Sequence, residues 1–331
     1  MGVVLPRLLP MQPYLREMVW GGRRLERLFA KELPPEKCIG EAFELSAYKA
    51  HESCVAAGPL AGRDLRGLLA EYRQALVGAA VWERYGAAFP LLIKLLDPQQ
   101  DLSIQVHPDD VYAQRNSLGP FGKMEAWFIL DATDGRIAYG LKPGTEPQDL
   151  VQALAADSVE EVVNFCSVQR GDVVFVPPGT VHALCRGVII YEVQQASDLT
   201  FRLFDYNRLG LDGKPRQLHI EQSLEVIDFA AKPLKPVPWW QLPGVGQAGG
   251  MLVDTPYFQL QLQRLDSARA FCSVPVFQAL TLIDGKAMIC SEQEQYPMGI
   301  GSTVLITADS TFEVVPQEDK PCEYLLAVAV A

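Results

Sequence analysis

The sequence predicts a mainly β protein that consists of two related β-barrels with a few helical insertions. Short apolar segments bounded by turn residues recur along most of the 331 residues, which is the pattern of strands in a sandwich or barrel. Only two longer stretches, residues 63–85 and 146–163, have the composition and the apolar spacing of helices. A weak internal repeat relates the central part of the chain to its C-terminal part.

The first 60 residues are predicted to be extended segments joined by turns. Alternation of polar and apolar residues through 41–46 predicts a half-buried strand. The stretch 63–85 is rich in Ala, Leu, Glu and Arg, and its main breakers are Gly67 and Gly78. We therefore expect two short helices in that insertion.

The centre of the chain is predicted to contain eight strands, at 90–96, 102–107, 123–130, 135–141, 172–176, 181–184, 187–193 and 200–205. The turn sequence Thr133-Asp134-Gly135 predicts a hairpin between two of them. The helix expected within 146–163 has Pro147 in its first turn and spaces Leu150, Val151, Leu154 and Val159 for one apolar face.

The last third of the chain is predicted to be a separate β unit. A polar loop at 206–222 and a short helical stretch precede a Pro/Gly-rich linker at 236–250. The linker divides the chain into a larger domain at 1–235 and a C-terminal β-barrel at 251–331. Strands are expected in the second domain at 257–264, 276–283, 286–291, 303–307, 311–315 and 323–330.

The internal repeat aligns residues 171–176 with residues 301–306 without a gap. Each segment follows a strand–hairpin–strand unit, with Asp-Gly at the turn in both copies. In this register His182 lies opposite Phe312, so the second copy lacks the polar residue. We therefore expect one barrel with a functional site and one degenerate barrel without it.

Charge and composition exclude several classes of function. A net charge of −11 and a pI near 4.9 argue against binding of nucleic acid or of an anionic membrane. No signal sequence is recognisable, and no apolar run approaches the ~20 residues of a membrane span. The seven scattered cysteines form no CxxC pair, which predicts reduced thiols. We expect a cytoplasmic protein without a nucleic-acid or membrane partner.

The most informative segment is the strand expected at 102–107. Because side chains alternate between the faces of a strand, Ser103, Gln105 and His107 share one face and apolar residues form the other. A buried polar side chain needs a partner, so three of them on one face are unusual for a purely structural strand. This strand is predicted to form one wall of a polar pocket.

Two further segments supply residues of the same chemistry. A Pro-Pro-Gly turn leads to His182 at a strand start, and the strand at 123–130 places Lys123 and Glu125 on one face. Together with Gln105 and His107, the residues Glu125 and His182 form a suitable ligand set for a divalent metal. Each residue taken singly also has a structural interpretation, and the spacing alone leaves the two alternatives open.

The sequence also resembles a known protein family. The segments FPLLIKLLD at 89–97 and LSIQVHP at 102–108 resemble the signature of type I mannose-6-phosphate isomerases (phosphomannose isomerases), in their shorter bacterial form. Similar blocks follow the family order: VWGG at 19–22, IGE at 39–41, GKMEAW at 122–127, PGTVHA at 178–183, YEVQQASD at 191–198 and TFRLFDY at 200–206. The resemblance covers most of residues 15–222.

The resemblance implies two cupin-like jelly-roll barrels, of which only the first binds a metal. It implies one zinc ion per chain. The implied zinc ligands are Gln105, His107, Glu125 and His182. The residues implied to line the sugar-phosphate pocket are Lys94, Ser103, Lys123, Glu192 and Arg202.

The implied reaction interconverts D-mannose 6-phosphate and D-fructose 6-phosphate. Zinc would act as a Lewis acid on O1 and O2 of the sugar, while a base moves a proton between C2 and C1. Glu192 is the expected base. Arg202 is expected on the partner strand across the turn at 196–198, and the structural alternative for Glu192 is an ion pair with Arg202. Lys123 is expected to be an acid or a phosphate ligand, and Arg202 to contact developing negative charge.

Two other classes of function remain as alternatives. One is a metal-dependent cupin oxygenase, although such sites usually contain more histidines than the two available in this candidate site. The other is a sugar-phosphate-binding protein without activity. We expect a monomer or a weak homodimer, and we assign no role to His51 or His219.

Overall fold

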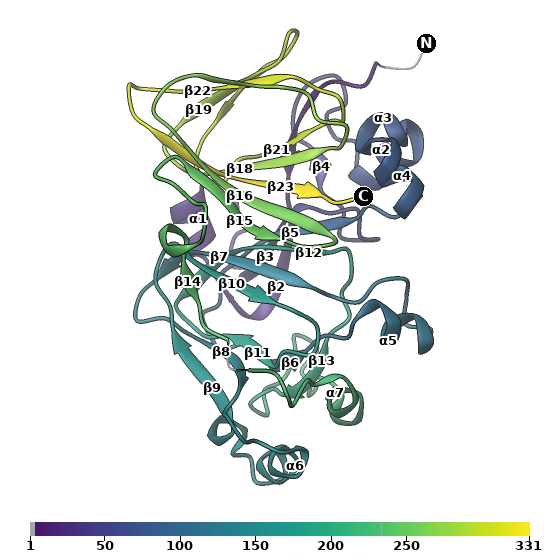
Figure 1. Ribbon diagram of the computed structural model, residues 1–331, viewed down its shortest axis with the longest axis vertical. Helices are drawn as coiled ribbons and strands as arrows, with labels where there is room; N and C mark the ends of the chain where they lie inside the picture. Colours follow the sequence, from purple (N-terminus) through teal and green to yellow (C-terminus); the bar gives the residue numbers. More distant parts are fainter. Residues whose placement is uncertain (1–3, 233) are drawn as a thin grey trace.

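Four antiparallel β-sheets, stacked in layers, make up the computed structural model, which describes residues 4–232 and 234–331 (Figure 1). The observed strands confirm the predicted mainly β class. Each half of the molecule is a sandwich of a seven-stranded sheet and a smaller sheet. Strand pairing among the described residues closes neither sandwich into a continuous barrel. No helix in this part of the chain is long and apolar enough to span a membrane.

The first sandwich contains a seven-stranded and a five-stranded sheet. The seven-stranded sheet has the order β14 (Val237–Pro238), β10 (Asp172–Val176), β7 (Glu125–Ala132), β12 (Val188–Gln195), β5 (Leu91–Leu96), β3 (Ile39–Leu45) and β2 (Tyr14–Gly22). The five-stranded sheet has the order β13 (Phe201–Phe204), β6 (Ile104–Val106), β11 (His182–Leu184), β8 (Arg136–Leu141) and β9 (Val163–Ser167). The two sheets face each other across a buried apolar cluster.

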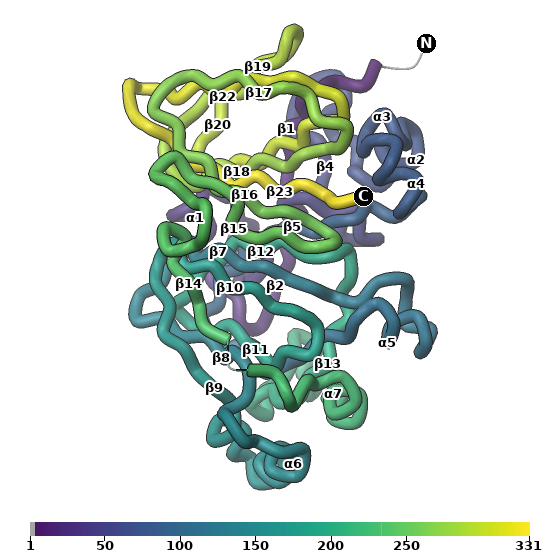
Figure 2. Tube along the Cα trace, viewed as in Figure 1, coloured from purple at the N-terminus to yellow at the C-terminus, as the bar shows by residue number. Residues whose placement is uncertain are grey.

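The second sandwich contains a seven-stranded and a four-stranded sheet. The seven-stranded sheet has the order β15 (Gly249–Asp254), β16 (Phe258–Leu265), β23 (Cys322–Ala329), β18 (Gln278–Asp284), β21 (Thr303–Ile306), β1 (Leu8–Gln12) and β4 (Cys54–Val55). The four-stranded sheet has the order β17 (Arg269–Phe271), β22 (Phe312–Pro316), β19 (Ala287–Cys290) and β20 (Gln295–Met298). Strands β1 and β4 thus come from the N-terminal part of the chain (Figure 2).

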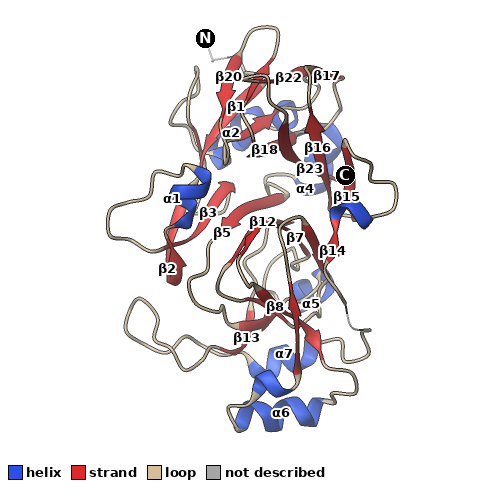
Figure 3. Ribbon diagram, turned by 90° about the vertical axis from the view of Figure 1, so that its left-hand side faces the viewer, coloured by secondary structure: helices blue, strands red, loops and turns tan. Residues whose placement is uncertain are grey.

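The helices lie outside the sheets (Figure 3). They are α1 (Arg24–Phe29), α2 (Leu65–Tyr72), α3 (Gln74–Val77), α4 (Ala79–Tyr85), α5 (Asp110–Arg115), α6 (Pro147–Ala155) and α7 (Ile220–Val226), with short 3₁₀ turns η1 (Val159–Glu161) and η2 (Trp239–Gln241). The first insertion forms three helices where the sequence predicted two, because Arg73 and Gly78 break the chain with positive φ angles of 49° and 97°. Helices α1 and α5 were not predicted.

The two seven-stranded sheets pack back to back and share the largest apolar core. In β5, Leu91, Ile93 and Leu95 belong to this shared core, whereas Lys94 and Leu96 point toward the five-stranded sheet. The same alternation in β7 and β12 separates the core residues from the polar ones. The layer order therefore places the charged side chains of Lys94, Glu125 and Glu192 in the space between the sheets of the first sandwich.

Strand β3 differs from its prediction because it is buried over all seven residues. Alternation predicted one exposed face, but the C-terminal sheet covers that face. There the buried Lys31 Nζ lies 2.7 Å from Glu44 Oε1 and donates to Gly301 O at 2.6 Å. Thr303 Oγ1 donates to Glu44 Oε2 at 2.9 Å, which joins the two halves through one buried carboxylate.

The sheet orders confirm the internal repeat. The series β10-β7-β12-β5-β3 corresponds to β21-β18-β23-β16-β15, and the glycine preceding the first strand has φ +90° in one copy and +87° in the other. His182 begins β11 and Phe312 begins β22, as the alignment predicts. His182 pairs with Gln105, whereas Phe312 pairs with Phe271 and stacks on it at 4.8 Å. Two phenylalanines thus occupy the positions of two candidate ligands.

The division into domains at 236–250 stays a prediction. The structure adds that strands β1 and β4 lie in the C-terminal sheet, so part of the predicted first domain contributes to the second half. Within the expected linker, β14 pairs with β10 and η2 forms a short turn. This segment therefore contains more regular secondary structure than we expected from its prolines.

We expect the substitution Lys31→Met to lower the free energy of unfolding by about 3 kcal/mol, because it leaves the buried Glu44 carboxylate without its cation. Urea unfolding followed by tryptophan fluorescence measures the change. Lys37→Met is the matched control, since it breaks the exposed ion pair with Glu17 (3.1 Å) and should cost less than about 1 kcal/mol. Equal effects of the two substitutions would show that the buried pair contributes no more than a surface pair.

Candidate metal centre and adjoining cavity

The candidate ligands come from both sheets of the first sandwich. Glu125 begins β7 in the seven-stranded sheet, while Gln105 and His182 lie opposite each other on β6 and β11 of the five-stranded sheet. His107 follows β6 directly. In β6, Ile104 and Val106 point into an apolar cluster on the other side, which is the alternation that the sequence predicted. The four side chains therefore meet between the sheets.

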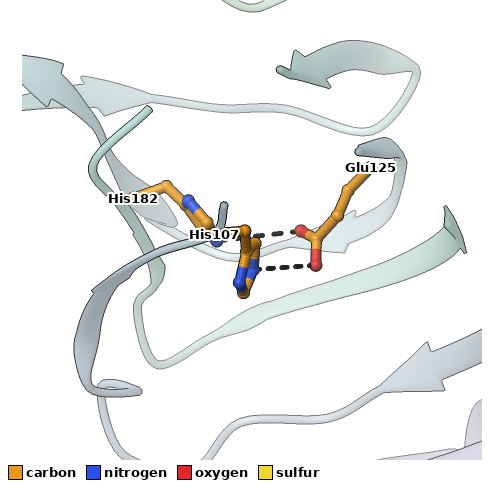
Figure 4. A group of neighbouring side chains, drawn as sticks. All are labelled: His107, Glu125 and His182. Atoms are coloured by element: carbon orange, nitrogen blue, oxygen red, sulfur yellow. Dashed lines mark ion pairs between the residues drawn. The ribbon is translucent and has the colours of Figure 1, made fainter. Parts of the chain in front are cut away.

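Three of these side chains form a compact buried group (Figure 4). The Nε2 atom of His107 lies 3.1 Å from Glu125 Oε1, and Nε2 of His182 lies 3.7 Å from Glu125 Oε2. One ligand atom from each residue lies within 4.8 Å of the others, and each residue is only 1% exposed. Such a group can hold a metal ion.

The hydrogen bonds of the two imidazole rings fix which nitrogen faces the centre. Nδ1 of His107 lies 2.8 Å from Leu199 O, and Nδ1 of His182 lies 2.9 Å from Thr180 O. Because a carbonyl oxygen only accepts, each Nδ1 carries the hydrogen and each Nε2 presents a lone pair to the centre. Burial and then Lys123 lower the pKa of His107 to about 3, and burial also lowers the pKa of His182. Both rings are neutral at pH 7, as metal ligation requires.

The arrangement requires a cation. Lone pairs of His107 Nε2 and Glu125 Oε1 face each other at 3.1 Å and repel unless positive charge lies beside them. Lys123 Nζ is such a charge, 2.5 Å from Glu125 Oε1 and 3.3 Å from His107 Nε2. Although burial opposes it, the charge of Lys123 holds the pKa of Glu125 well below its usual value. The donor set thus fits a divalent ion, which would share Glu125 with this ammonium group.

Gln105 lies beside His182 at the edge of the group. Its amide Nε2 is 3.3 Å from His182 Nε2, and its Oε1 accepts from Ser103 Oγ at 3.4 Å. Half a turn about the last bond of this side chain would exchange the amide oxygen and nitrogen. Gln105 can therefore offer an oxygen toward the same centre.

Trp127 connects the metal-ligand group to a second carboxylate. Its indole N–H lies 3.1 Å from both Glu125 Oε2 and Glu192 Oε1 and donates to them. Glu192 is buried, and burial followed by the Glu125 charge raises the pKa of Glu192 to about 7, against the effect of Lys94. Lys94 Nζ lies 3.4 Å from Glu192 Oε2 and 3.5 Å from Glu41 Oε1. Glu192 is thus a carboxyl group that can change protonation near neutral pH.

A polar cavity of about 220 Å³ adjoins the centre. Predicted residues that line it are Lys94, Ser103, Gln105, Lys123, Glu192 and Arg202. Additional residues on its walls include Arg16, Glu41, Asp198, Thr200 and Arg216. The predicted pocket residues therefore meet in one place, and they are joined by charged residues that the sequence analysis did not single out.

The position of Arg202 differs from the expectation. It was expected on the strand paired with that of Glu192, but β13 pairs with β6 and β12 lies in the opposite sheet. The ion partner of Glu192 is Lys94, and among the described residues Arg202 Nε has no hydrogen-bond acceptor. The guanidinium group thus faces the cavity from the side opposite Glu192.

The additional charged residues differ in whether the sequence could have identified them. Glu41 interrupts a strand that is otherwise apolar on the same side, and Arg16 pairs with it in register and by an ion pair of 3.2 Å. Arg216 lies in an irregular loop, where Asp205 accepts from its Nε at 2.6 Å. The alternation of polar and apolar residues along a strand could have identified Glu41. Such alternation gives no information about a loop residue such as Arg216.

Comparison with known proteins places this geometry in a family. The family model described as "Phosphomannose isomerase type I, catalytic domain" matches residues 8–133. A probable mannose-6-phosphate isomerase from Bacillus subtilis is 33% identical, over 90% of this chain and 92% of that protein. A mannose-6-phosphate isomerase from Streptococcus mutans is 32% identical, over 94% of this chain and 98% of that protein. The chain belongs to the type I phosphomannose isomerase family.

Solved structures of phosphomannose isomerases share the fold. The mannose 6-phosphate isomerase of Bacillus subtilis superposes with a TM-score of 0.85 at 28% identity, covering 97% of this chain and 99% of that one. A phosphomannose isomerase variant from Salmonella typhimurium gives 0.76 at 17% identity, covering 98% and 100%. These likenesses extend over both sandwiches, so the layered arrangement is common to the phosphomannose isomerase fold.

The substitution His182→Phe should abolish tight metal binding, because it removes one imidazole from the donor set. The fold should persist, since Phe312 occupies the equivalent position in the other sandwich. Metal content after dialysis, measured by mass spectrometry, and the melting temperature test this. His51→Phe is the control, because His51 packs among Tyr14, Phe43 and Tyr48 away from the ligand group. Stoichiometric metal in the His182→Phe protein would remove His182 from the site.

Proposed function

We propose that this protein is a metal-dependent isomerase that interconverts D-mannose 6-phosphate and D-fructose 6-phosphate. The observation that carries the proposal is the buried His107–Glu125–His182 group beside a cavity lined by several cations and by a carboxyl group of raised pKa. Family membership supports the substrate, because the relatives are named for mannose 6-phosphate. No second reaction is favoured by an observation of comparable weight.

The metal is proposed to be one zinc ion per chain, held by His107, Glu125, His182 and an amide oxygen of Gln105. A structural neighbour of the same fold, 17% identical, is described as a zinc-bound mannose 6-phosphate isomerase. Nitrogen and oxygen donors with a single carboxylate suit zinc, and the ion when bound supplies Lewis acidity toward the sugar oxygens O1 and O2.

Glu192 is the proposed base. A group with a pKa of about 7 is half ionised at neutral pH, so it can accept the proton from C2 and return it to C1 with a small energetic penalty in either direction. Trp127 holds the carboxylate by its indole N–H, and Lys94 supplies positive charge on the other oxygen. The competing structural role is now an ion pair with Lys94 that only shapes the cavity.

The remaining cavity residues are proposed to bind the substrate. Arg202 presents a guanidinium edge without a partner among the described residues, which suits a phosphate or developing negative charge. Lys123 and Ser103 reach the same cavity from the ligand side. We further propose that the enzyme acts in the cytoplasm on this small sugar phosphate, as a monomer or a weak homodimer, without a nucleic-acid or membrane partner.

Glu192→Gln should lower kcat for mannose 6-phosphate by at least about a hundredfold, because the amide cannot accept the proton. In the wild-type enzyme kcat should fall as the pH decreases through about 7, since protonation removes the ionised base. A coupled assay of fructose 6-phosphate formation, run from pH 5.5 to 9, measures both effects. The acidic limb of the profile should disappear in the variant.

The control for this experiment is Glu41→Gln, which removes the other carboxylate beside Lys94. If Glu192 only forms an ion pair, the two substitutions should have similar effects and Glu192 would not be the base. Glucose 6-phosphate should be assayed in parallel to test discrimination between the epimers. A wild-type, metal-loaded protein that converts neither substrate would contradict the proposed function.

A further inference from the structure

One carboxylate, that of Asp110, ties the ligand-bearing segments to the C-terminal sandwich. Asp110 begins α5, three residues after His107. Its Oδ1 accepts from Gly122 N at 2.7 Å and from Gln195 Nε2 at 2.9 Å. Its Oδ2 accepts from the Tyr257 hydroxyl at 3.0 Å. Three donors from three separate segments thus converge on this carboxylate.

These contacts fix the backbone that precedes the candidate carboxylate ligand. All three amides of residues 122–124 are held, because Lys123 N donates to Pro108 O at 2.9 Å and Met124 N donates to Gln195 Oε1 at 3.0 Å. The two segments approach so closely that a Cβ on Gly122 would lie 2.3 Å from the backbone of the facing segment. Contacts with residues 108–110 and with Gln195 therefore set the register of Lys123 and of Glu125, the candidate ligand two residues later.

Tyr257 comes from the opposite half of the molecule and is itself held in place. It lies between β15 and β16, and its hydroxyl reaches a residue 147 positions earlier in the chain. The Arg84 guanidinium lies 5.7 Å from the Tyr257 ring centre and donates to Pro256 O at 2.9 Å. Burial and then Asp110 raise the pKa of Tyr257 to about 12, so the hydroxyl keeps its hydrogen and donates at neutral pH. This hydroxyl is a fixed donor to the carboxylate.

We propose that Tyr257 and Asp110 are positioning residues for the metal centre, so that the C-terminal sandwich holds Lys123 and Glu125 in their working geometry. The kinetic part of this inference rests on the proposed isomerase function, whereas the metal-binding part does not. Loss of the Tyr257 hydroxyl leaves one oxygen of Asp110 without its donor. Loss of the Asp110 carboxylate releases Gly122 N, Gln195 and Tyr257 together.

The test compares Tyr257→Phe with Tyr85→Phe. Tyr85 also bonds the C-terminal segment, since its hydroxyl donates to Val330 O at 3.1 Å, and the substitution keeps its ring contact with Phe121. Each variant loses one hydrogen bond between the halves, and similar small decreases in melting temperature are expected. Only Tyr257→Phe should weaken zinc affinity, by roughly three- to tenfold in a chelator competition, and lower kcat by a similar factor. The KM should change by less than twofold.

The Asp110 variants supply the second arm of the test. Asp110→Ala should lower zinc affinity and kcat more than Tyr257→Phe does. Asp110→Asn should retain most of the zinc affinity and most of kcat, because its amide oxygen still accepts from Gly122 N and its NH₂ group can donate to Tyr257.

Equal zinc affinities in Tyr257→Phe and Tyr85→Phe would overturn the inference, whatever the kinetics show. An active wild-type enzyme with equal kcat in these two variants would also overturn it. An inactive wild-type protein that still shows the predicted difference in zinc affinity would contradict the proposed function and leave the positioning role supported.

Discussion

The buried carboxylate of Glu125 is the constraint on which the rest of the site depends. Two imidazole lone pairs face it from the opposite sheet, and the Glu125 side chain is almost completely buried. Such a carboxylate is costly to bury unless cations and hydrogen-bond donors surround it. Lys123 and the indole of Trp127 supply two of these partners, and the proposed divalent ion would supply a third. Burial and then this negative charge raise the pKa of Glu192, the proposed base, to about 7.

The layered fold makes this arrangement possible. The central seven-stranded sheet of the first sandwich is covered on both sides, and one of its faces is mainly apolar. That face packs on the C-terminal sheet, and the other face presents Lys94, Glu125 and Glu192 to the five-stranded sheet. The C-terminal sandwich has the same strand order, but Phe271 and Phe312 fill the positions of Gln105 and His182. The first sandwich thus contains the candidate metal ligands. The C-terminal sandwich covers the back of the first one and, through Tyr257, contacts the segment that follows His107.

Local pattern predicted most of the strands, though not β9, β15, β17 or β20, and it brought together half of the candidate site. Alternation along β6 placed Gln105 and His107 together, and the repeat register placed His182 opposite Phe312. Alternation failed for β3, because burial of its second face depends on a sheet formed more than 200 residues later. The pairing of β1 with β21, the position of Arg216 and the bond from Tyr257 to Asp110 also join distant segments. Periodicity describes the neighbours of a residue along the chain, so it carries no information about such contacts.

The central claim is that a carboxyl group of this chain moves a proton between C2 and C1 of the sugar. The most direct measurement is isomerisation of mannose 6-phosphate to equilibrium by the zinc-loaded enzyme in D₂O, followed by mass spectrometry and NMR of the fructose 6-phosphate formed. Proton transfer through Glu192 predicts deuterium at C1, because the protonated base exchanges with solvent during some of the many turnovers. Complete absence of deuterium after equilibration would contradict this account and favour a direct hydride shift between the two carbons.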